Sequence, residues 1–384
     1  MKVAIVGAGM TKFGELWEYS CRDLITLAGI EAIQSAGIEG KDIQEIYGGS
    51  MSPGLFAGQE HISAMFADYA GLKGIPSTRV EAACASGGLA LRQAYLSIKS
   101  GRNDLVIAGG VEKMTDVPTQ SAVVTLMGAG DEEWESFQGL TFPGLYALMA
   151  RRHMFEYGTT IEQMSLVSVK NHYNASLNEK AQFNFKVTLD DVMNSPMVAD
   201  PLRLLHCSPI TDGAAAVVLA SEKKAREITD TPIWILGSGL ATDTIALHDR
   251  ESLSQLRSAK LAAEVAYKNA GIKAKDVSFA EVHDCFAIAE ILAIEALGFC
   301  KFGEGGKLTE AGETALNGSI PINPSGGLKA KGHPVGATGI AQAVECFLQL
   351  TGKAGKRQIK DAEIALAQNV GGSGATCVVH IFSK

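Results

Sequence analysis

The arrangement of apolar and polar positions along the 384-residue chain predicts alternating strands and helices. Short and almost continuous apolar runs occur at residues 105–108 and 364–367. Such runs are typical of strands in a sheet that helices cover on both faces. Other segments repeat alanine at every fourth position, which places a small-residue stripe along one face of a helix. The pattern therefore predicts an α/β protein.

This pattern occurs twice in the same order. The strand and Gly-x-Gly turn of residues 3–9 recur at residues 233–239, and the alanine-striped helical segment of residues 28–43 recurs at 262–277. A strand that begins Gly-Ala also ends each half, at residues 213–218 and 374–379. Three ordered matches indicate internal duplication. We therefore predict two similar halves, residues 1–225 and 226–384.

The two halves differ by one long insertion. Between residues 112 and 205 the first half carries a segment rich in Met, Phe and Tyr that has no counterpart in the second. A segment of this length without structure of its own is uncommon in a compact protein. We therefore predict a loop domain, at about residues 116–205, that covers a substrate. A charged linker at residues 221–231 is expected between the halves.

Composition and charge exclude several classes of protein. With 46% hydrophobic and 20% charged residues, the chain is not disordered or fibrous. A net charge of −8 without a basic run argues against nucleic acid or an anionic membrane as a partner. We expect neither a membrane span nor a signal peptide. Seven cysteines without a CxxC pair favour reduced thiols in the cytoplasm over a disulfide framework or structural zinc.

Cys84 follows a predicted strand ending near Val80 and precedes a predicted helix. At a helix N-terminus, free backbone N–H groups and the helix dipole favour a thiolate. The small residues 85–88 are expected to leave room for a substrate. A lone cysteine is more often inert and buried. The surrounding Gly/Ala/Ser cluster and the histidine loops described next favour a nucleophile.

Two further loops carry histidine. His283, Asp284 and Cys285 follow a predicted strand, and their succession suggests a metal site. Adjacent side chains diverge, however, and no further ligand set accompanies them, so we predict no metal there. His333 lies in a glycine-rich turn that would bring its ring to the surface of a cleft. A last glycine-rich turn at residues 369–374 is suited to presenting backbone N–H donors.

Taken together, Cys84, the HDCF run at residues 283–286, the GHPVGATG run at 332–339 and the NVGGSG turn at 369–374 resemble the thiolase superfamily. The resemblance covers essentially the whole chain. It implies two βαβαβαββ halves in a five-layer α-β-α-β-α arrangement, with an inserted loop domain over a coenzyme A thioester. It also implies a homodimer or homotetramer, and no metal or other cofactor.

The resemblance assigns roles residue by residue. It implies that Cys84 is the nucleophile that becomes acylated and that His333 receives its proton and then helps to bind the thioester oxygen. His283 stands where many thiolases have the Asn of an NEAF motif, in the first oxyanion hole. The backbone N–H groups of Cys84 and Gly371 would form the second oxyanion hole.

One position departs from the family pattern. Many thiolases have a second reactive cysteine in a C-terminal Cys-x-Gly run, where this chain has Asn369. Because an amide cannot shuttle a proton, we assign that role to Cys285, with simple packing of Cys285 as the alternative. Gly326, Gly327 and Asn369 are expected to bind substrate.

The expected reaction is Claisen condensation of two acetyl-CoA, or its reverse. The HDCF run resembles the archaeal and sterol-carrier-protein-type thiolases, which implies a role before hydroxymethylglutaryl-CoA synthase in the mevalonate route and a complex with that enzyme. Two alternatives remain open. A decarboxylating ketoacyl synthase also uses a Cys and two His but needs no acid–base cysteine. A non-catalytic acyl-CoA-binding scaffold would be expected to lose the nucleophile or the His333 position.

Overall fold

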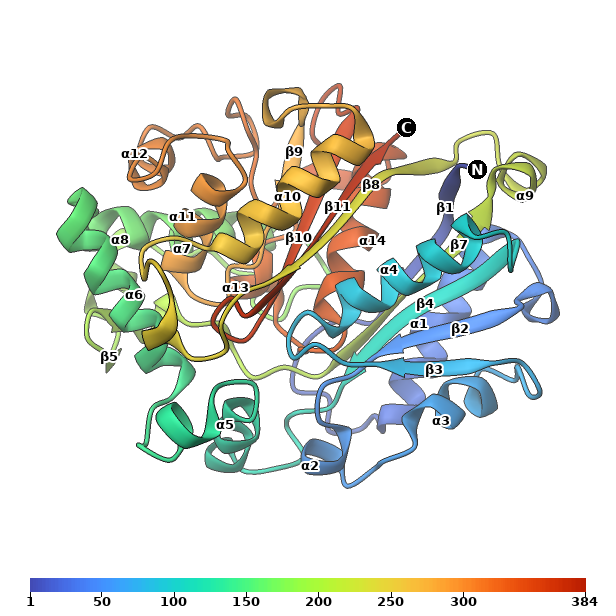
Figure 1. Cartoon of the computed structure of the whole chain (residues 1–384), viewed down its shortest axis with the longest axis horizontal. Coiled ribbons are helices and arrows are strands. Elements are labelled where there is room, and N and C mark those ends of the chain that lie inside the picture. The colour runs from blue at the N-terminus through green and yellow to red at the C-terminus, as the bar shows by residue number, and fades with distance from the viewer.

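Nine strands form the centre of the molecule in a computed structural model that describes residues 1–384 (Figure 1). The strands of the first half are β1 (Val3–Met10), β2 (Glu45–Gly49), β3 (Ser77–Val80), β4 (Leu105–Glu112) and β7 (Gly213–Ser221). Those of the second are β8 (Ile233–Thr242), β9 (Phe279–Glu281), β10 (Ile364–Gly371) and β11 (Thr376–Ser383).

The order of these strands in the sheet follows the duplication seen in the sequence. It runs β3-β2-β4-β7-β1-β8-β11-β10-β9, so β1 and β8 meet at the seam between the halves. On either side of this seam come two antiparallel neighbours and then a parallel one: β7, β4 and β2 in the first half, and β11, β10 and β9 in the second. β3 extends the first half only.

Helices cover the strands in layers. The helices that define these layers are α1 (Cys21–Ala36), α3 (Ile62–Tyr69), α4 (Ser86–Lys99), α10 (Arg257–Ala270) and α14 (Thr338–Leu350). α1 packs on β1 and β7, and α10 packs on β8 and β11, as Figure 1 shows for α10. α4 and α14 contact each other and strands of both halves, so they form the middle layer. The predicted α-β-α-β-α arrangement is confirmed.

The glycines and alanines of the repeat explain how closely these layers approach. A Cβ added to Gly9 would lie 2.6 Å from the carbonyl oxygen of Ala28 on α1. One added to Gly239 would overlap the carbonyl oxygen of Ala262 on α10 in the same way. The small-residue stripe therefore allows each outer helix to touch the backbone of its strand.

The insertion folds into helices and packs on the second half. It contains α5 (Thr119–Met127), a π-helical turn (Glu132–Ser136), α6 (Phe142–Tyr157), α7 (Ile161–Ala175), α8 (Leu189–Asn194), β5 (Met197–Ala199) and β6 (Leu202–Arg203). Its α6 and α7 contact α11 (Ala287–Ala296), and α7 also contacts α12 (Gly305–Glu310) and α13 (Gly327–Lys331). Figure 1 shows these insertion helices beside the helices of the second half. The insertion thus joins one half to the other.

The remaining elements are short. They are α2 (Pro53–Ala57), α9 (Glu222–Ile228) and 3₁₀ turns at Gly40–Asp42, Leu204–His206, Leu247–Asp249, Ala274–Asp276 and Gly355–Arg357. The charged segment expected as a linker therefore forms α9, whose N-terminus is capped by the Ser221 side chain. No helix combines the length and apolar character needed to cross a membrane.

Candidate active site

A cavity of about 190 Å³ lies where the insertion meets the motif loops of both halves. Most of its wall is apolar, and α5 and α6 supply much of it. Its chemically reactive wall residues are Cys84, Tyr146, Cys207, Cys285 and His333, with Gly372 beside them. A mostly apolar cavity with a few converging reactive groups is the usual form of a site for a small substrate.

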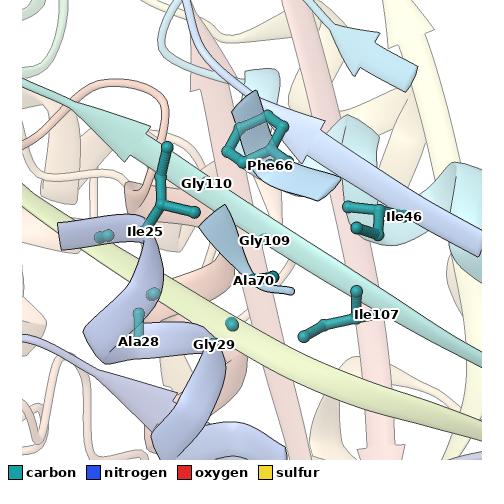
Figure 2. Close-up of a pocket in the computed structure, with 12 residues that line it drawn as sticks. Ile25, Ala28, Gly29, Ile46, Phe66, Ala70, Ile107, Gly109 and Gly110 are labelled. Carbon is teal, nitrogen blue, oxygen red and sulfur yellow. The ribbon is translucent and has the colours of Figure 1, made fainter. Parts of the chain in front are cut away.

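Figure 2 shows a second hollow with a different character. It lies among α1, α3 and strands of the first half, where side chains such as Ile25, Phe66 and Ile107 surround it. Its volume of about 30 Å³ has room for about one water molecule, and no ionisable side chain lines it. This hollow is a gap in the packing beneath α1 and cannot carry the chemistry.

Cys84 lies in a tight turn between β3 and α4. Ala83 before it has a positive φ of 51°, and the Ser86 hydroxyl closes the turn by donating to the carbonyl of Ala83 at 2.6 Å. α4 begins at Ser86, so the predicted position of Cys84 just before a helix is confirmed. Left-handed backbone at a non-glycine residue is uncommon and is found most often where function requires it.

The expected thiolate is not the resting state. Burial raises the pKa of Cys84 to about 12, although the backbone N–H groups of Gly372 and of Cys84 itself lower it. Loss of hydration therefore outweighs the helix N-terminus, and the thiol is protonated at neutral pH. A base has to remove this proton when substrate binds.

His333 is suited to be that base. Burial lowers its pKa to about 3, so the imidazole is neutral. Its Nδ1 lies 2.7 Å from the hydroxyl of Thr338, which donates its own hydrogen to the carbonyl of Pro334 at 2.9 Å. The hydroxyl must then accept from Nδ1–H, which leaves the Nε2 lone pair free to take a proton.

Three side chains that are far apart in the sequence converge here. The sulfur of Cys84 and ring nitrogens of His283 and His333 all lie within 4.8 Å of one another, and the two rings meet edge to face at 5.0 Å. A Cys/His set of this kind can bind zinc, but only as a thiolate with a lone pair from each ring. The same arrangement, a thiol beside two imidazole rings, is also what proton transfer to and from a nucleophilic cysteine requires.

His283 is held with one nitrogen free. Its backbone N–H donates to Gln368, its Nδ1 lies 3.2 Å from the amide nitrogen of Asn369, and its buried Nε2 has no hydrogen-bond partner. Burial lowers its pKa well below the usual value, so this ring is neutral too. A buried polar atom without a partner at such a site is available to a ligand.

Cys285 contributes a second thiol to the cavity wall. Burial raises its pKa well above the usual value, whereas a hydrogen bond from the Tyr146 hydroxyl lowers it and the nearby Cys84 raises it. In the resting protein the single hydrogen of this hydroxyl goes to the carbonyl of Gly372 at 3.2 Å, and it turns to the Cys285 sulfur when that sulfur becomes a thiolate. Tyr146 was not predicted from the sequence; the only signal was the aromatic content of the insertion.

Asp284 anchors the loop that carries His283 and Cys285. Its carboxylate accepts from the backbone N–H of Leu328 at 2.7 Å and from that of Lys329 at 3.3 Å, at the start of α13. It also accepts from the amide of Asn171 on α7 at 2.7 Å. The middle residue of the HDC run therefore joins this loop to the insertion and to the segment before His333.

Several expected substrate contacts lie elsewhere. Gly326 packs against Ala175, Gly327 packs against Asp284, and neither lines the cavity. Asn369 lies behind the wall, and the backbone N–H that faces the Cys84 sulfur belongs to Gly372, next to Gly371, whose place in an oxyanion hole stays a prediction. These positions depend on how separate loops cross, which a single sequence does not define.

The small residues after Cys84 do not leave room for substrate. Residues 85–88 do not line the cavity. A Cβ on Gly87 would lie 2.7 Å from the carbonyl oxygen of Gly336, and one on Gly88 would lie 2.9 Å from Asn369. They allow α4 to approach the start of α14 and the end of β10.

Known proteins resemble this chain along its full length. Residues 3–223 match the family model "Thiolase, N-terminal domain", and residues 239–384 match "Thiolase C-terminal domain-like". A solved structure named "Ltp2-ChsH2(DUF35) aldolase" superposes with a TM-score of 0.87 at 25% identity, covering 100% of this chain and 97% of that one.

Curated relatives are similar at higher identity. "Acetyl-CoA acetyltransferase" of Methanothermobacter thermautotrophicus is 59% identical, with 100% of this chain and 99% of the relative covered. The protein of the same name from Methanocaldococcus jannaschii is 55% identical over 99% and 98%. "Sterol carrier protein 2" of Bos taurus is 36% identical over 98% of this chain and 71% of its own length. The chain belongs to the thiolase family.

Proposed function

We propose that the protein is an acetyl-CoA acetyltransferase that condenses two acetyl-CoA to acetoacetyl-CoA and CoA, or runs the reverse thiolysis, through an acetyl group on Cys84. The observation that carries this proposal is one cavity wall holding a nucleophilic thiol, a neutral imidazole base and a second thiol. The names of the two relatives above 50% identity support the same reaction.

In the first half-reaction, His333 Nε2 takes the proton of Cys84 as the sulfur attacks the thioester carbonyl. The N–H groups of Cys84 and Gly372 face the Cys84 sulfur, and in this proposal the N–H groups of Cys84 and Gly371 stabilise the oxyanion. The C–S bond to CoA then breaks, and the leaving thiolate takes the proton of Cys285. This step leaves acetyl-Cys84, a protonated His333 and a Cys285 thiolate.

In the second half-reaction, the Cys285 thiolate removes a C2 proton from a second acetyl-CoA. A thiolate whose pKa burial has raised is a strong base, which this weakly acidic C–H bond requires. His283 and His333 can donate to the enolate oxygen. The enolate carbon attacks acetyl-Cys84, acetoacetyl-CoA leaves, and His333 returns its proton to the Cys84 sulfur, which restores the resting state.

Alternative chemistries are possible on this fold, since the superposed structure is named an aldolase. A decarboxylating synthase needs no acid–base thiol, so the position of Cys285 in the cavity favours the thiolase reaction. A non-catalytic scaffold would not need the converging Cys84, His283 and His333.

The wider setting of the reaction rests on the resemblance alone. We infer a cytoplasmic enzyme that uses CoA thioesters as substrates without a metal or other cofactor. Its product would be consumed by hydroxymethylglutaryl-CoA synthase in the mevalonate route, in a complex with this chain.

Mass spectrometry of the intact protein after mixing with acetyl-CoA tests the core of this proposal. We expect the chain to gain one acetyl group, which peptide mapping places on Cys84, and the Cys84→Ala variant to gain none. Acetylation elsewhere, or turnover by Cys84→Ala at the wild-type rate, would show that the nucleophile is wrong.

A further inference from the structure

Asn369 lies on β10 directly behind the reactive side chains and is 2% exposed. Its amide makes three contacts. Oδ1 accepts from the backbone N–H of Gly88 at 3.0 Å, and Nδ2 donates to the carbonyl of Cys84 at 3.0 Å. Nδ2 also lies 3.2 Å from Nδ1 of His283. No part of Asn369 lines the cavity.

Two of these partners fix the orientation of the amide. A backbone N–H can only donate and a carbonyl can only accept. If the amide were turned over, its NH₂ group would face the N–H of Gly88 and its oxygen would face the carbonyl oxygen of Cys84, and both hydrogen bonds would be lost. The packing also leaves the amide no room to move. A Cβ on Gly88 would lie 2.9 Å from Oδ1, and one on Gly339 would overlap it.

This orientation determines which nitrogen of His283 carries the proton. The second hydrogen of Asn369 Nδ2 points to His283 Nδ1, which must therefore present its lone pair. In a neutral imidazole the proton then resides on Nε2. That nitrogen is buried and has no partner, and its ring belongs to the cluster with Cys84 and His333.

We propose that Asn369 is a positioning residue that holds His283 as its Nε2–H tautomer, so that a hydrogen-bond donor faces the oxygen of the second thioester. This role rests on the proposed function, but the tautomer itself does not. The positioning role gives Asn369 a function in the active site although it stands where many thiolases have a reactive cysteine. Without Asn369, the ring could place its proton on Nδ1 and turn an acceptor toward the enolate.

Nitrogen-15 NMR of histidine-labelled protein tests the tautomer directly. We expect Nδ1 of His283 to be unprotonated and Nε2 protonated in the wild-type protein, with the resonances assigned by their loss in His283→Asn. A protonated Nδ1 in wild type overturns the proposal, and this result needs neither turnover nor a folded Asn369 variant. Where Asn369→Ala is also measured, Gln342→Ala is its matched control. Gln342 is a buried amide on α14 whose one hydrogen bond goes to the Gln368 carbonyl and not to His283. It should leave these resonances unchanged.

A double-mutant cycle tests the role in catalysis. Asn369→Ala should lower kcat for condensation by roughly 10- to 100-fold with little change in KM, less than the loss of a whole oxyanion donor costs. In the His283→Asn background the same substitution should cost almost nothing, because a side-chain amide presents N–H without a choice of tautomer.

The two outcomes are distinct. An equal loss in both backgrounds would mean that Asn369 only supports the turn at Cys84 and the start of α4, and would overturn the proposal. If the wild-type protein condenses no acetyl-CoA, the proposed function fails, while the NMR result still decides the tautomer.

Discussion

At the scale of single residues, opposing effects act on Cys84. Its place before a helix is visible in the sequence and favours a thiolate. Its burial depends on the insertion and on both halves, and it raises the pKa to about 12. Because desolvation of a charge is the larger effect in a closed site, the resting pair is a neutral thiol and a neutral imidazole.

The reactivity of Cys84 should therefore increase with pH without a plateau. Below its pKa the thiolate fraction rises about tenfold for each pH unit, so alkylation by iodoacetamide should accelerate steadily from about pH 6 to 9. The measurement is the rate of label incorporation, with Cys84→Ala used to subtract the other cysteines. A plateau that begins near pH 7 would indicate a preformed thiolate–imidazolium pair instead.

Cys285→Ala should separate the two half-reactions. The variant should still accept an acetyl group on Cys84, but condensation should fall by roughly 10²- to 10⁴-fold because the C2 proton has no base. Cys207→Ala is the matched control, since Cys207 also lines the cavity but has no assigned role. Normal condensation by Cys285→Ala would return the proton transfer to His333.

Tyr146→Phe tests the hydroxyl that lies between Gly372 and Cys285. The ring should stay in place, because it packs against Phe286 with ring centroids 4.7 Å apart. Loss of the hydrogen bond to the thiolate should raise the pKa of Cys285 further, so that Cys285 gives up its proton to the leaving CoA less readily. Condensation should slow by about 10-fold, as expected for one charge-assisted hydrogen bond of about 1.4 kcal/mol or more. The ratio of condensation to Cys84 acetylation measures this effect, and an unchanged ratio would remove Tyr146 from the site.

At the scale of helices and strands, the periodic features of single elements were predictable from the sequence. The packing of elements that are far apart in the chain was not. The alanine stripes, their closing glycines and the duplicated strands are local patterns, and the structure confirms them. Gly87 and Gly88 pack against α14 and β10, which lie about 250 residues away or more along the chain. The sequence alone therefore suggested room for a substrate at these glycines instead of close packing. The helices of the insertion also lack a repeat to reveal them.

A pair of glycine substitutions tests this packing. Gly239→Ala would overlap the backbone of α10 and should lower the free energy of unfolding by about 1–3 kcal/mol. Gly29→Ala on α1 meets nothing within 4 Å, extends into the hollow of Figure 2, and should raise it by about 0.5–1 kcal/mol. Urea denaturation measures both, and equal effects of the two variants would contradict the close approach.

At the scale of the whole molecule, no single part carries the site. Cys84 comes from the first half, Tyr146 from the insertion, and His283, Cys285, His333 and Asn369 from the second half. The middle layer of α4 and α14 holds the Cys84 turn against the loop of His333. Duplication therefore supplied the framework, while each half came to hold different reactive groups, which is why the motifs in the sequence do not repeat as the strands do.

The two edges of the nine-stranded sheet differ, and this difference bears on assembly. Beyond β9, Ala280 bridges to Ile322, whereas β3 pairs only with β2 and is partly exposed along its length. An open edge strand presents unpaired N–H and C=O groups that another chain can pair with.

Since the chain mass is 40.4 kDa, we expect light scattering to give a homo-oligomer at a multiple of this mass. Hydrogen exchange of the β3 amides should slow as protein concentration rises, while that of β9 should not change. A mass near that of one chain throughout the micromolar range, with rapid exchange in β3, would mean that the edge stays open and the protein is a monomer.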